Sequence, residues 1–347
     1  MEDYYARPLT KEEQAAYHAM AQGLSAIAPS FPVPKLEMDR LSDLLFRLRL
    51  DHPELFYITG FSCRSYPQAS SMEMVPRYLF DKAKVRTHQK ALSARLDKLC
   101  REATGLDEWQ KAEYVHDLMC RLVHYDKLKK PYSHEIIGPL TQGVGVCEGI
   151  AKSVKALCDR LGVWCIVAIS HNAPDQGIRY RHAWNIVRLG GSYYHLDATF
   201  DNALSAGDLL RRDYLLLGDR QIFRDHQPPV YPLPPCPDET RAFYRREKLS
   251  FTRMEDVSRR ALQAARKGVP LVFHWRGGYL TRAVLKELLE LLDQAAREKR
   301  RYVQVRLNWP QAVLEAVFTS EPPGNTLVPQ QANLGEELEA PLPPEDA

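Results

Sequence analysis

A predicted β-hairpin constrains the fold of this chain more than any other feature. Its arms are residues 182–189 and 192–199, and the pair Gly190-Gly191 joins them. A two-residue Gly-Gly connection between strand-like segments is a strong signal for a tight turn. Such a turn fixes the register, and because side chains alternate across a strand, His182 and Asp197 should share a face as diagonal neighbours. A three-residue turn would place them on opposite faces.

A glycine-rich turn before this hairpin delivers a cysteine to the start of a predicted helix. The turn Gly143-Val144-Gly145-Val146 leads directly into Cys147. One apolar stripe follows before the expected C-cap Gly162, and it consists of Ile150, Ala151, Val154, Leu157, Cys158 and Leu161. A thiol in a first helical turn meets the positive end of the helix dipole and unpaired N–H groups, which favour thiolate and could hold an oxyanion. A cysteine near a helix start is, however, more often simply buried.

Together the helix and the hairpin suggest a nucleophile, a base and an orienting acid. In this hypothesis Asp197 fixes the tautomer of His182, which takes the proton of Cys147 and later gives one to the leaving amine. A metal site is the alternative, because His195 lies on the same predicted face as Asp197. No short i, i+4 or C-x-x-C spacing preorganises such ligands, so we expect neither a metal nor a cofactor.

The cysteines and the N-terminus indicate the compartment. Seven cysteines are an odd number and no two form a C-x-x-C pair, which argues against a disulfide framework and a structural zinc site. The N-terminus lacks the basic start and apolar stretch of a signal peptide. The longest apolar run, residues 163–169, is far shorter than the ~20 residues that cross a bilayer. We therefore expect a soluble cytoplasmic protein with no membrane contact.

Hydrophobic periodicity predicts mixed helices and strands along the whole chain. Helices are expected at residues 11–27, 36–50, 84–101, 107–122, 254–267 and 281–297. Strands outside the hairpin are expected at residues 56–61, 74–80, 163–170, 269–274 and 302–307.

Prolines and charge divide the chain into parts. Six prolines in residues 228–237 indicate a stiff linker, and six acidic residues without Lys or Arg indicate a disordered tail at 321–347. The predicted division is an N-terminal α/β module (1–103), a core (104–227), the linker (228–240), a small C-terminal α/β module (241–320) and the acidic tail (321–347).

The C-terminal module is basic. Residues 241–306 hold 17 Lys and Arg against 7 Asp and Glu. A basic patch can bind nucleic acid or another anionic partner, but no nucleic-acid motif accompanies it and the charges are spaced as on a solvated helix face. We expect no specific nucleic-acid partner, and an anionic partner of this module stays open.

Three blocks of the core resemble a known family. They are Gly145-Val146-Cys147-Glu148-Gly149-Ile150-Ala151, His182-Ala183-Trp184-Asn185 and Leu196-Asp197-Ala198-Thr199. The combination is similar to the signature of the transglutaminase-like superfamily, a papain-like group of cysteine acyl-transfer enzymes that includes transglutaminases, bacterial proteases and peptide N-glycanases. The resemblance covers about residues 106–226.

The resemblance implies both a fold and a set of roles. The fold would be α+β, with a helix that carries the cysteine packed on an antiparallel sheet that carries the histidine and the aspartate. Cys147 would be the nucleophile, His182 the base and Asp197 the orienting acid. The oxyanion donor stays open, with Gln142 as one candidate.

We therefore expect cysteine-dependent acyl transfer or hydrolysis of a peptide or protein amide through a thioester, as in a protease, a deamidase or a transglutaminase. Hydrolysis is favoured over cross-linking because water is always at hand. The alternative is a binding or scaffolding protein that retains the fold without turnover.

Overall fold

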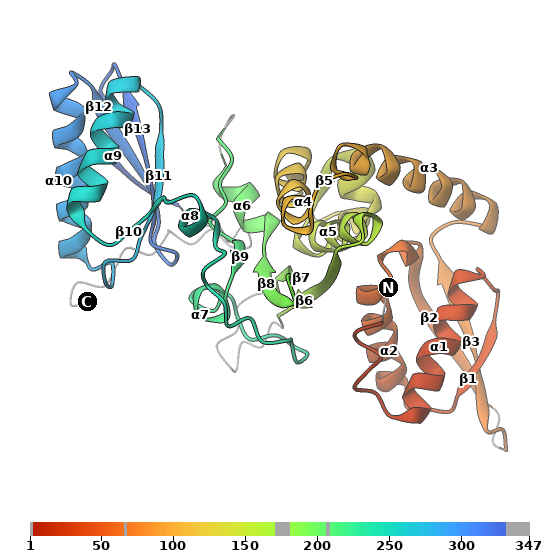
Figure 1. Cartoon of the computed structure of the whole chain (residues 1–347). Coiled ribbons are helices and arrows are strands. Elements are labelled where there is room, and N and C mark those ends of the chain that lie inside the picture. The colour runs from red at the N-terminus through yellow and green to blue at the C-terminus, as the bar shows by residue number, and fades with distance from the viewer. Residues whose placement is uncertain (1–2, 66–67, 171–180, 206–208, 331–347) are drawn as a thin grey trace. The chain divides into compact units, whose positions relative to one another are not determined.

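The chain forms two compact units that do not follow chain order. The computed structural model describes residues 3–65, 68–170, 181–205 and 209–330 (Figure 1). The first unit comprises Met1–Ile169, Arg181–Ser192 and Pro229–Leu233. The second unit comprises Ser170–Tyr180, Tyr193–Pro228 and Pro234–Ala347.

The N-terminal part of the first unit combines helices with a small antiparallel sheet of order β1-β3-β2 (Figure 1). Its elements are α1 (Lys11–Ser25), β1 (Phe31–Pro34), α2 (Met38–Asp51), η1 (Pro53–Leu55), β2 (Ile58–Ser65), β3 (Ser71–Tyr78), α3 (Lys82–Cys100) and η2 (Arg101–Ala103). A capping box formed by Thr10 and Glu13 starts α1. The predicted helices are confirmed here within a few residues.

The rest of the first unit surrounds the helix that carries Cys147. Its elements are α4 (Glu108–Leu122), β4 (His124–Tyr125), η3 (Pro131–His134), η4 (Gly138–Gln142), β5 (Val144–Gly145), α5 (Cys147–Leu161), β6 (Trp164–Ile169) and β7 (Ala183–Leu189). Helix α5 packs against the antiparallel pair β6 and β7, with α3 and α4 also in contact with it. Gly162 ends α5 in the left-handed conformation, as predicted. The prediction of a cysteine-bearing helix on antiparallel strands is thus confirmed for this pair.

The predicted two-residue turn is confirmed, but the arm after it is shorter than predicted. Gly190 and Gly191 have φ of 57° and 81°, the positive pair that a type I′ turn requires. Strand β8 (Ser192–Leu196) ends before Asp197, and α6 (Ala198–Leu204) follows. The prediction of strand up to residue 199 was wrong because Asp197 starts a helix instead.

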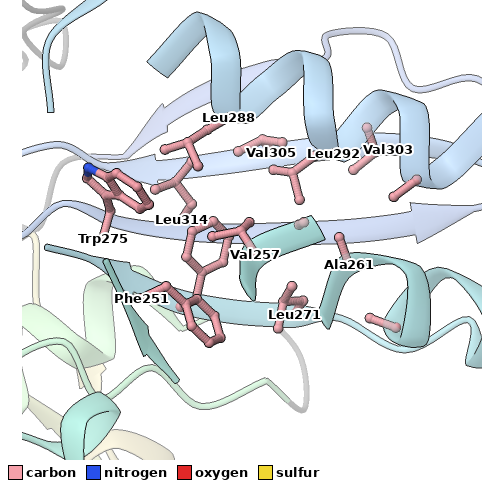
Figure 2. Packing of buried hydrophobic residues seen from close by; sticks show 14 of the residues in the cluster. Phe251, Val257, Ala261, Leu271, Trp275, Leu288, Leu292, Val303, Val305 and Leu314 are labelled. Atoms are coloured by element: carbon pink, nitrogen blue, oxygen red, sulfur yellow. The ribbon is translucent and has the colours of Figure 1, made fainter. Parts of the chain in front are cut away.

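The second unit holds a five-stranded sheet of order β10-β11-β13-β12-β14. Its elements after β8 and α6 are β9 (Leu215–Leu217), α7 (Asp219–Ile222), α8 (Phe243–Arg246), β10 (Ser250–Phe251), α9 (Met254–Lys267), β11 (Leu271–Trp275), α10 (Arg282–Glu298), β12 (Tyr302–Asn308), β13 (Val313–Thr319) and β14 (Leu327–Gln330). Helices α9 and α10 pack on each other and on the sheet. Figure 2 shows the core between them, to which Leu288 and Leu292 of α10 and Val257 of α9 contribute.

A buried polar cluster lies against this sheet within the same unit. The Arg211 guanidinium, with no exposed surface, binds the Asp213 carboxylate at 2.6 Å and Glu315 of β13 at 3.1 Å. Asn308 of β12 donates to Asp213 at 2.8 Å. Because buried charges are costly unless paired, this complete pairing joins residues 211–214 firmly to the sheet.

Strand β14 differs from the predicted tail. Residues 327–330 pair in parallel with β12, so the prediction of disorder from residue 321 was wrong for them. The rest of the predicted tail, residues 331–347, lies outside the described residues. In the proline-rich stretch, Tyr231 packs in the first unit and Cys236 is buried in the second. The predicted division into five parts stays a prediction.

Candidate active site

The loop between β4 and α5 is folded tightly onto the first turn of α5. The Asp126 carboxylate accepts hydrogen bonds from two backbone N–H groups of this loop and from the Ser133 hydroxyl. The Ser133 carbonyl in turn accepts from the N–H of Val146 at 3.0 Å. Since Val146 is the N-cap of α5, the loop is pinned at the residue that precedes Cys147.

Gly149 allows the close approach of this loop. A Cβ at this position would lie 2.2 Å from the Ser133 carbonyl oxygen, far inside the 3.0 Å that real Cβ contacts keep. The absence of a side chain two residues after Cys147 therefore lets the loop lie directly on the helix.

Cys147 is the first residue of α5 and is half-buried. Its N-cap Val146 offers no side-chain hydrogen bond, so no capping side chain of that residue takes up the N–H groups of the first turn. The side chain of Cys147 packs against an apolar cluster that includes Ala151, Ile169 and Ala183. Apart from Cys63, the other cysteines are buried, which makes Cys147 one of two partly accessible thiols.

A buried lysine stabilises the same turn through ion pairs. Lys152, with no exposed side-chain surface, places Nζ 3.0 Å from a Glu135 oxygen and 3.0 Å from a Glu148 oxygen. Burial by itself raises the pKa of Glu148. Lys152, His134 and Arg181 together lower the pKa by a larger amount, so it lies well below its usual range. Glu148 therefore stays a carboxylate beside Cys147.

Glu148 also connects the helix start to the start of β7. Its Oε2 lies 3.8 Å from a guanidinium nitrogen of Arg181, whose guanidinium also stacks on Phe46 at 4.7 Å from the ring centre. The residue after Cys147 and the residue before His182 thus form an ion pair. Cys147 also packs on the cluster that contains Ala183. The neighbours of the predicted nucleophile and the neighbours of the predicted base are therefore in contact within one unit.

His182 directly precedes β7 and is buried. Its ring stacks on Trp184, with centroids 6.0 Å apart and planes inclined by 11°. Two residues apart, the rings share a face of the strand. Asn185 donates to the carbonyls of Ala151 at 2.9 Å and of Ile166 at 3.1 Å, and so ties β7 to α5 and to β6.

Asp197 belongs to the second unit and is the N-cap of α6. Its Oδ1 accepts from the N–H groups of Thr199 at 2.8 Å and Phe200 at 3.2 Å. Its Oδ2 bonds to Nε2 of His226 at 2.9 Å. The carboxylate is therefore oriented from two sides, although it lies on a helix cap and not in a strand as predicted.

His195 and Asp197 bind different partners. Nε2 of His195 lies 2.9 Å from the Asp219 carboxylate, whose other oxygen accepts from the N–H of Cys236 at 2.8 Å. The alternation argument that grouped His195 with Asp197 as possible metal ligands was therefore wrong, because the strand ends between them. Gln142 is exposed, and its amide donates to Thr141 at 3.4 Å.

Sequence reasoning missed His226, Lys152 and Glu135. His226 lies 29 positions after Asp197, and no repeating pattern connects the two. The adjacent Asp225 was the one local sign that His226 could be paired with a carboxylate. Lys152 interrupts an apolar stripe, which is a sign of a buried, paired charge.

The comparisons with known proteins agree with the predicted resemblance. Residues 94–198 match the model of the transglutaminase-like superfamily. This region holds Cys147, His182 and Asp197, and the chain thus has mixed helix and sheet content with a transglutaminase-like core. No curated protein matches the chain.

Three solved structures are similar to it at low identity. The structure of a TGase shares 13% identity with TM-score 0.28, over 52% of this chain and 53% of that one. The "putative cysteine protease from Cytophaga hutchinsonii" shares 17% identity with TM-score 0.24, over 40% and 61%. The crystal structure of menin, which reveals the binding site for Mixed Lineage Leukemia protein, shares 14% identity with TM-score 0.28, over 84% of this chain and 62% of that one. Each match covers less than two thirds of the solved chain.

In the described parts of the chain, every helix is too short or too polar to cross a bilayer.

Proposed function

We propose that this protein is a cysteine-dependent enzyme of amide acyl transfer, with Cys147 as nucleophile, His182 as base and Asp197 as orienting acid. The observation that supports it best is the ion pair between Glu148 and Arg181, which ties the residue after the nucleophile to the residue before the base.

The first half of the reaction forms a thioester. His182 takes the thiol proton, Sγ of Cys147 attacks the carbonyl carbon of a peptide or protein amide, and the carbonyl oxygen becomes an oxyanion. Backbone N–H groups at the start of α5, which the Val146 side chain does not cap, would donate to this charge and stabilise it. The C–N bond then breaks, and the amine leaves with the proton that His182 returns.

The second half releases the acyl group. His182 removes a proton from water, the hydroxide oxygen attacks the thioester carbon, and the C–S bond breaks to give a carboxylic acid and the free thiol. Protease and deamidase chemistry differ only in the amine that leaves. We favour hydrolysis over transamidation because the described residues offer no evident amine site.

Alkylation with iodoacetamide tests this proposal. An unactivated thiol with a pKa of about 8.5 is roughly 1% ionised at pH 6.5, so a thiolate–imidazolium pair would react on the order of 100 times faster there. Peptide mass spectrometry follows the rate at Cys147, and Cys63, the other partly exposed thiol, is the matched control in the same sample. Burial raises the pKa of Cys63, so its rate should be low.

The expected result is fast labelling of Cys147 that His182→Ala abolishes while Cys63 is unaffected. Labelling of Cys147 no faster than that of Cys63 would contradict catalysis and favour the binding or scaffolding function. Peptides that carry a thiol-reactive electrophile, scored by the mass added to Cys147, then identify the substrate class.

A further inference from the structure

A second histidine holds the predicted orienting acid. Nε2 of His226 lies 2.9 Å from Oδ2 of Asp197, and Nδ1 lies 3.0 Å from Oδ1 of Asp225. The His226 ring is enclosed by Phe200 and Tyr214, at centroid distances of 4.6 Å and 5.6 Å. The side chain has no exposed surface, and these contacts help to fix its position.

The geometry also fixes the protonation of His226. An ionised carboxylate only accepts hydrogen bonds, so a ring placed between two carboxylates must donate from both nitrogens and carry a positive charge. Within the second unit, Asp197, Asp225 and the Tyr214 hydroxyl are among the titratable groups that face it, and His195 lies near enough to feel its charge. Burial lowers the pKa of His226, but the hydrogen bonds and charges of Asp197 and Asp225 raise it above the ordinary value.

The C-terminal sheet reaches this histidine through Asp225. The amide of Gln311, which lies between β12 and β13 and is 3% exposed, donates to Oδ1 of Asp225 at 3.2 Å and to the Gln221 carbonyl at 3.1 Å. The Tyr214 hydroxyl donates to the other Asp225 oxygen. A continuous run of hydrogen bonds therefore extends from the sheet to Asp197, all within the second unit.

We propose that His226 is a positioning residue, which as an imidazolium between Asp225 and Asp197 fixes the Asp197 carboxylate, with Gln311 anchoring the assembly to the C-terminal sheet. The inference rests on the proposed role of Asp197 as the orienting acid. It gives the C-terminal module a task, since the module supports the acid through Gln311 and Asp225. A carboxylate has about four lone-pair sites, so the three donors described above do not preclude a further one from His182.

The first test observes His226 itself. In protein labelled with ¹⁵N-histidine, NMR should show both ring nitrogens of His226 protonated at about pH 7, above the ordinary midpoint of about 6.5. Asp225→Asn should move the His226 midpoint to lower pH. A His226 that is singly protonated at neutral pH in the wild-type protein would overturn the proposal.

The second test measures what His226 does for the nucleophile, again by alkylation of Cys147 with iodoacetamide across pH. His226→Leu removes the donor and should raise the ionisation midpoint of Cys147 by about one unit, which slows labelling about tenfold at pH values below both midpoints. His226→Gln keeps an N–H donor near the place of Nε2 and should stay within about threefold of wild type, since one neutral hydrogen bond is retained.

His195→Gln is the matched control, because His195 is an equally buried histidine bonded to a carboxylate, Asp219, in the same unit. It should lose stability and leave both rate and midpoint unchanged. If His226→Leu does not fold, Gln311→Leu serves in its place and should slow labelling about threefold, for the loss of its hydrogen bond to Asp225. A folded variant of either kind with the wild-type pH profile would refute the positioning role.

The two proposals can fail separately. If wild-type Cys147 reacts no faster than Cys63, the proposed function fails, and the NMR arm alone decides whether His226 holds Asp197 as an imidazolium.

Discussion

Gly149→Ala offers the sharpest test of how the nucleophile turn is built. A methyl group here would lie 2.2 Å from the Ser133 carbonyl oxygen, so the loop would have to retreat by about 0.8 Å to reach even the 3.0 Å limit. The obstructing atom belongs to the backbone and also accepts the N–H of Val146. The move would therefore strain that hydrogen bond as well.

The size of the effect follows from two opposing contributions. Ala is favoured over Gly inside a helix by about 1 kcal/mol, which taken alone would stabilise the variant. Overpacking costs about 1–3 kcal/mol, and loss of a backbone hydrogen bond costs about 1 kcal/mol more. We expect a net loss of about 1–3 kcal/mol in the free energy of unfolding.

Urea unfolding measures this change, and the alkylation rate of Cys147 should fall with it because the turn is displaced. Gly105→Ala is the matched control, since no atom lies within 4 Å of its Cβ position, and it should change stability by no more than about 0.5 kcal/mol. A Gly149→Ala protein at least as stable as wild type would show that the loop does not press on α5 as described.

Two further predictions concern buried charges of the first unit. Lys152→Met leaves the Glu135 and Glu148 carboxylates without their shared cation and should cost about 3 kcal/mol in urea unfolding at pH 7. Because the pKa of Glu148 is lowered in the folded state, that contribution is fully present above its ordinary value of 4.5 and is lost as pH falls through the lower folded-state pKa. The deficit should therefore begin to shrink below pH 4.5 and continue to shrink as the solution is made more acidic, and a pH-independent deficit would contradict the charge argument. Burial raises the pKa of Asp51 from 3.8 to about 6, although Tyr17 and the Tyr5 N–H lower it. Its contribution is therefore full below pH 3.8 and falls as pH rises through about 6, so wild type should lose about 2 kcal/mol relative to Asp51→Asn between pH 4 and 7. Parallel curves for the two proteins would refute this.

The helices were predictable because their sequences repeat at the helical period. The predicted range 254–267 coincides with α9, and Thr281 was included in the prediction at the position where it caps α10. Strands were less predictable where pairing with a neighbouring strand, and not the sequence of the segment itself, decides the conformation. β1 contains two prolines, which a sheet tolerates because β1 lies at the edge of the sheet.

The candidate site was predictable only in part, for a similar reason. Cys147, His182 and Asp197 lie in short blocks with strong turn and cap signals, although the cap signal of Asp197 was interpreted as strand. His226 and Glu135 reach their partners only through tertiary folding, and no spacing rule connects residues 29 or 17 positions apart in such loops. Local chemistry therefore points to the reacting groups, whereas their supports emerge only from coordinates.

Strand β14 has a practical consequence for anyone who shortens this protein. It covers the outer side of β12 from Val305 to Asn308, and Gln330 at its end accepts from the buried Arg211 guanidinium at 2.6 Å. Removing residues 327–330 would expose β12 as an unpaired edge strand, which can pair with another copy of the chain. It would also remove one hydrogen-bond acceptor from the buried Arg211 guanidinium. A shortened chain for crystallisation should therefore keep Gln330, because a cut four residues earlier would promote self-association.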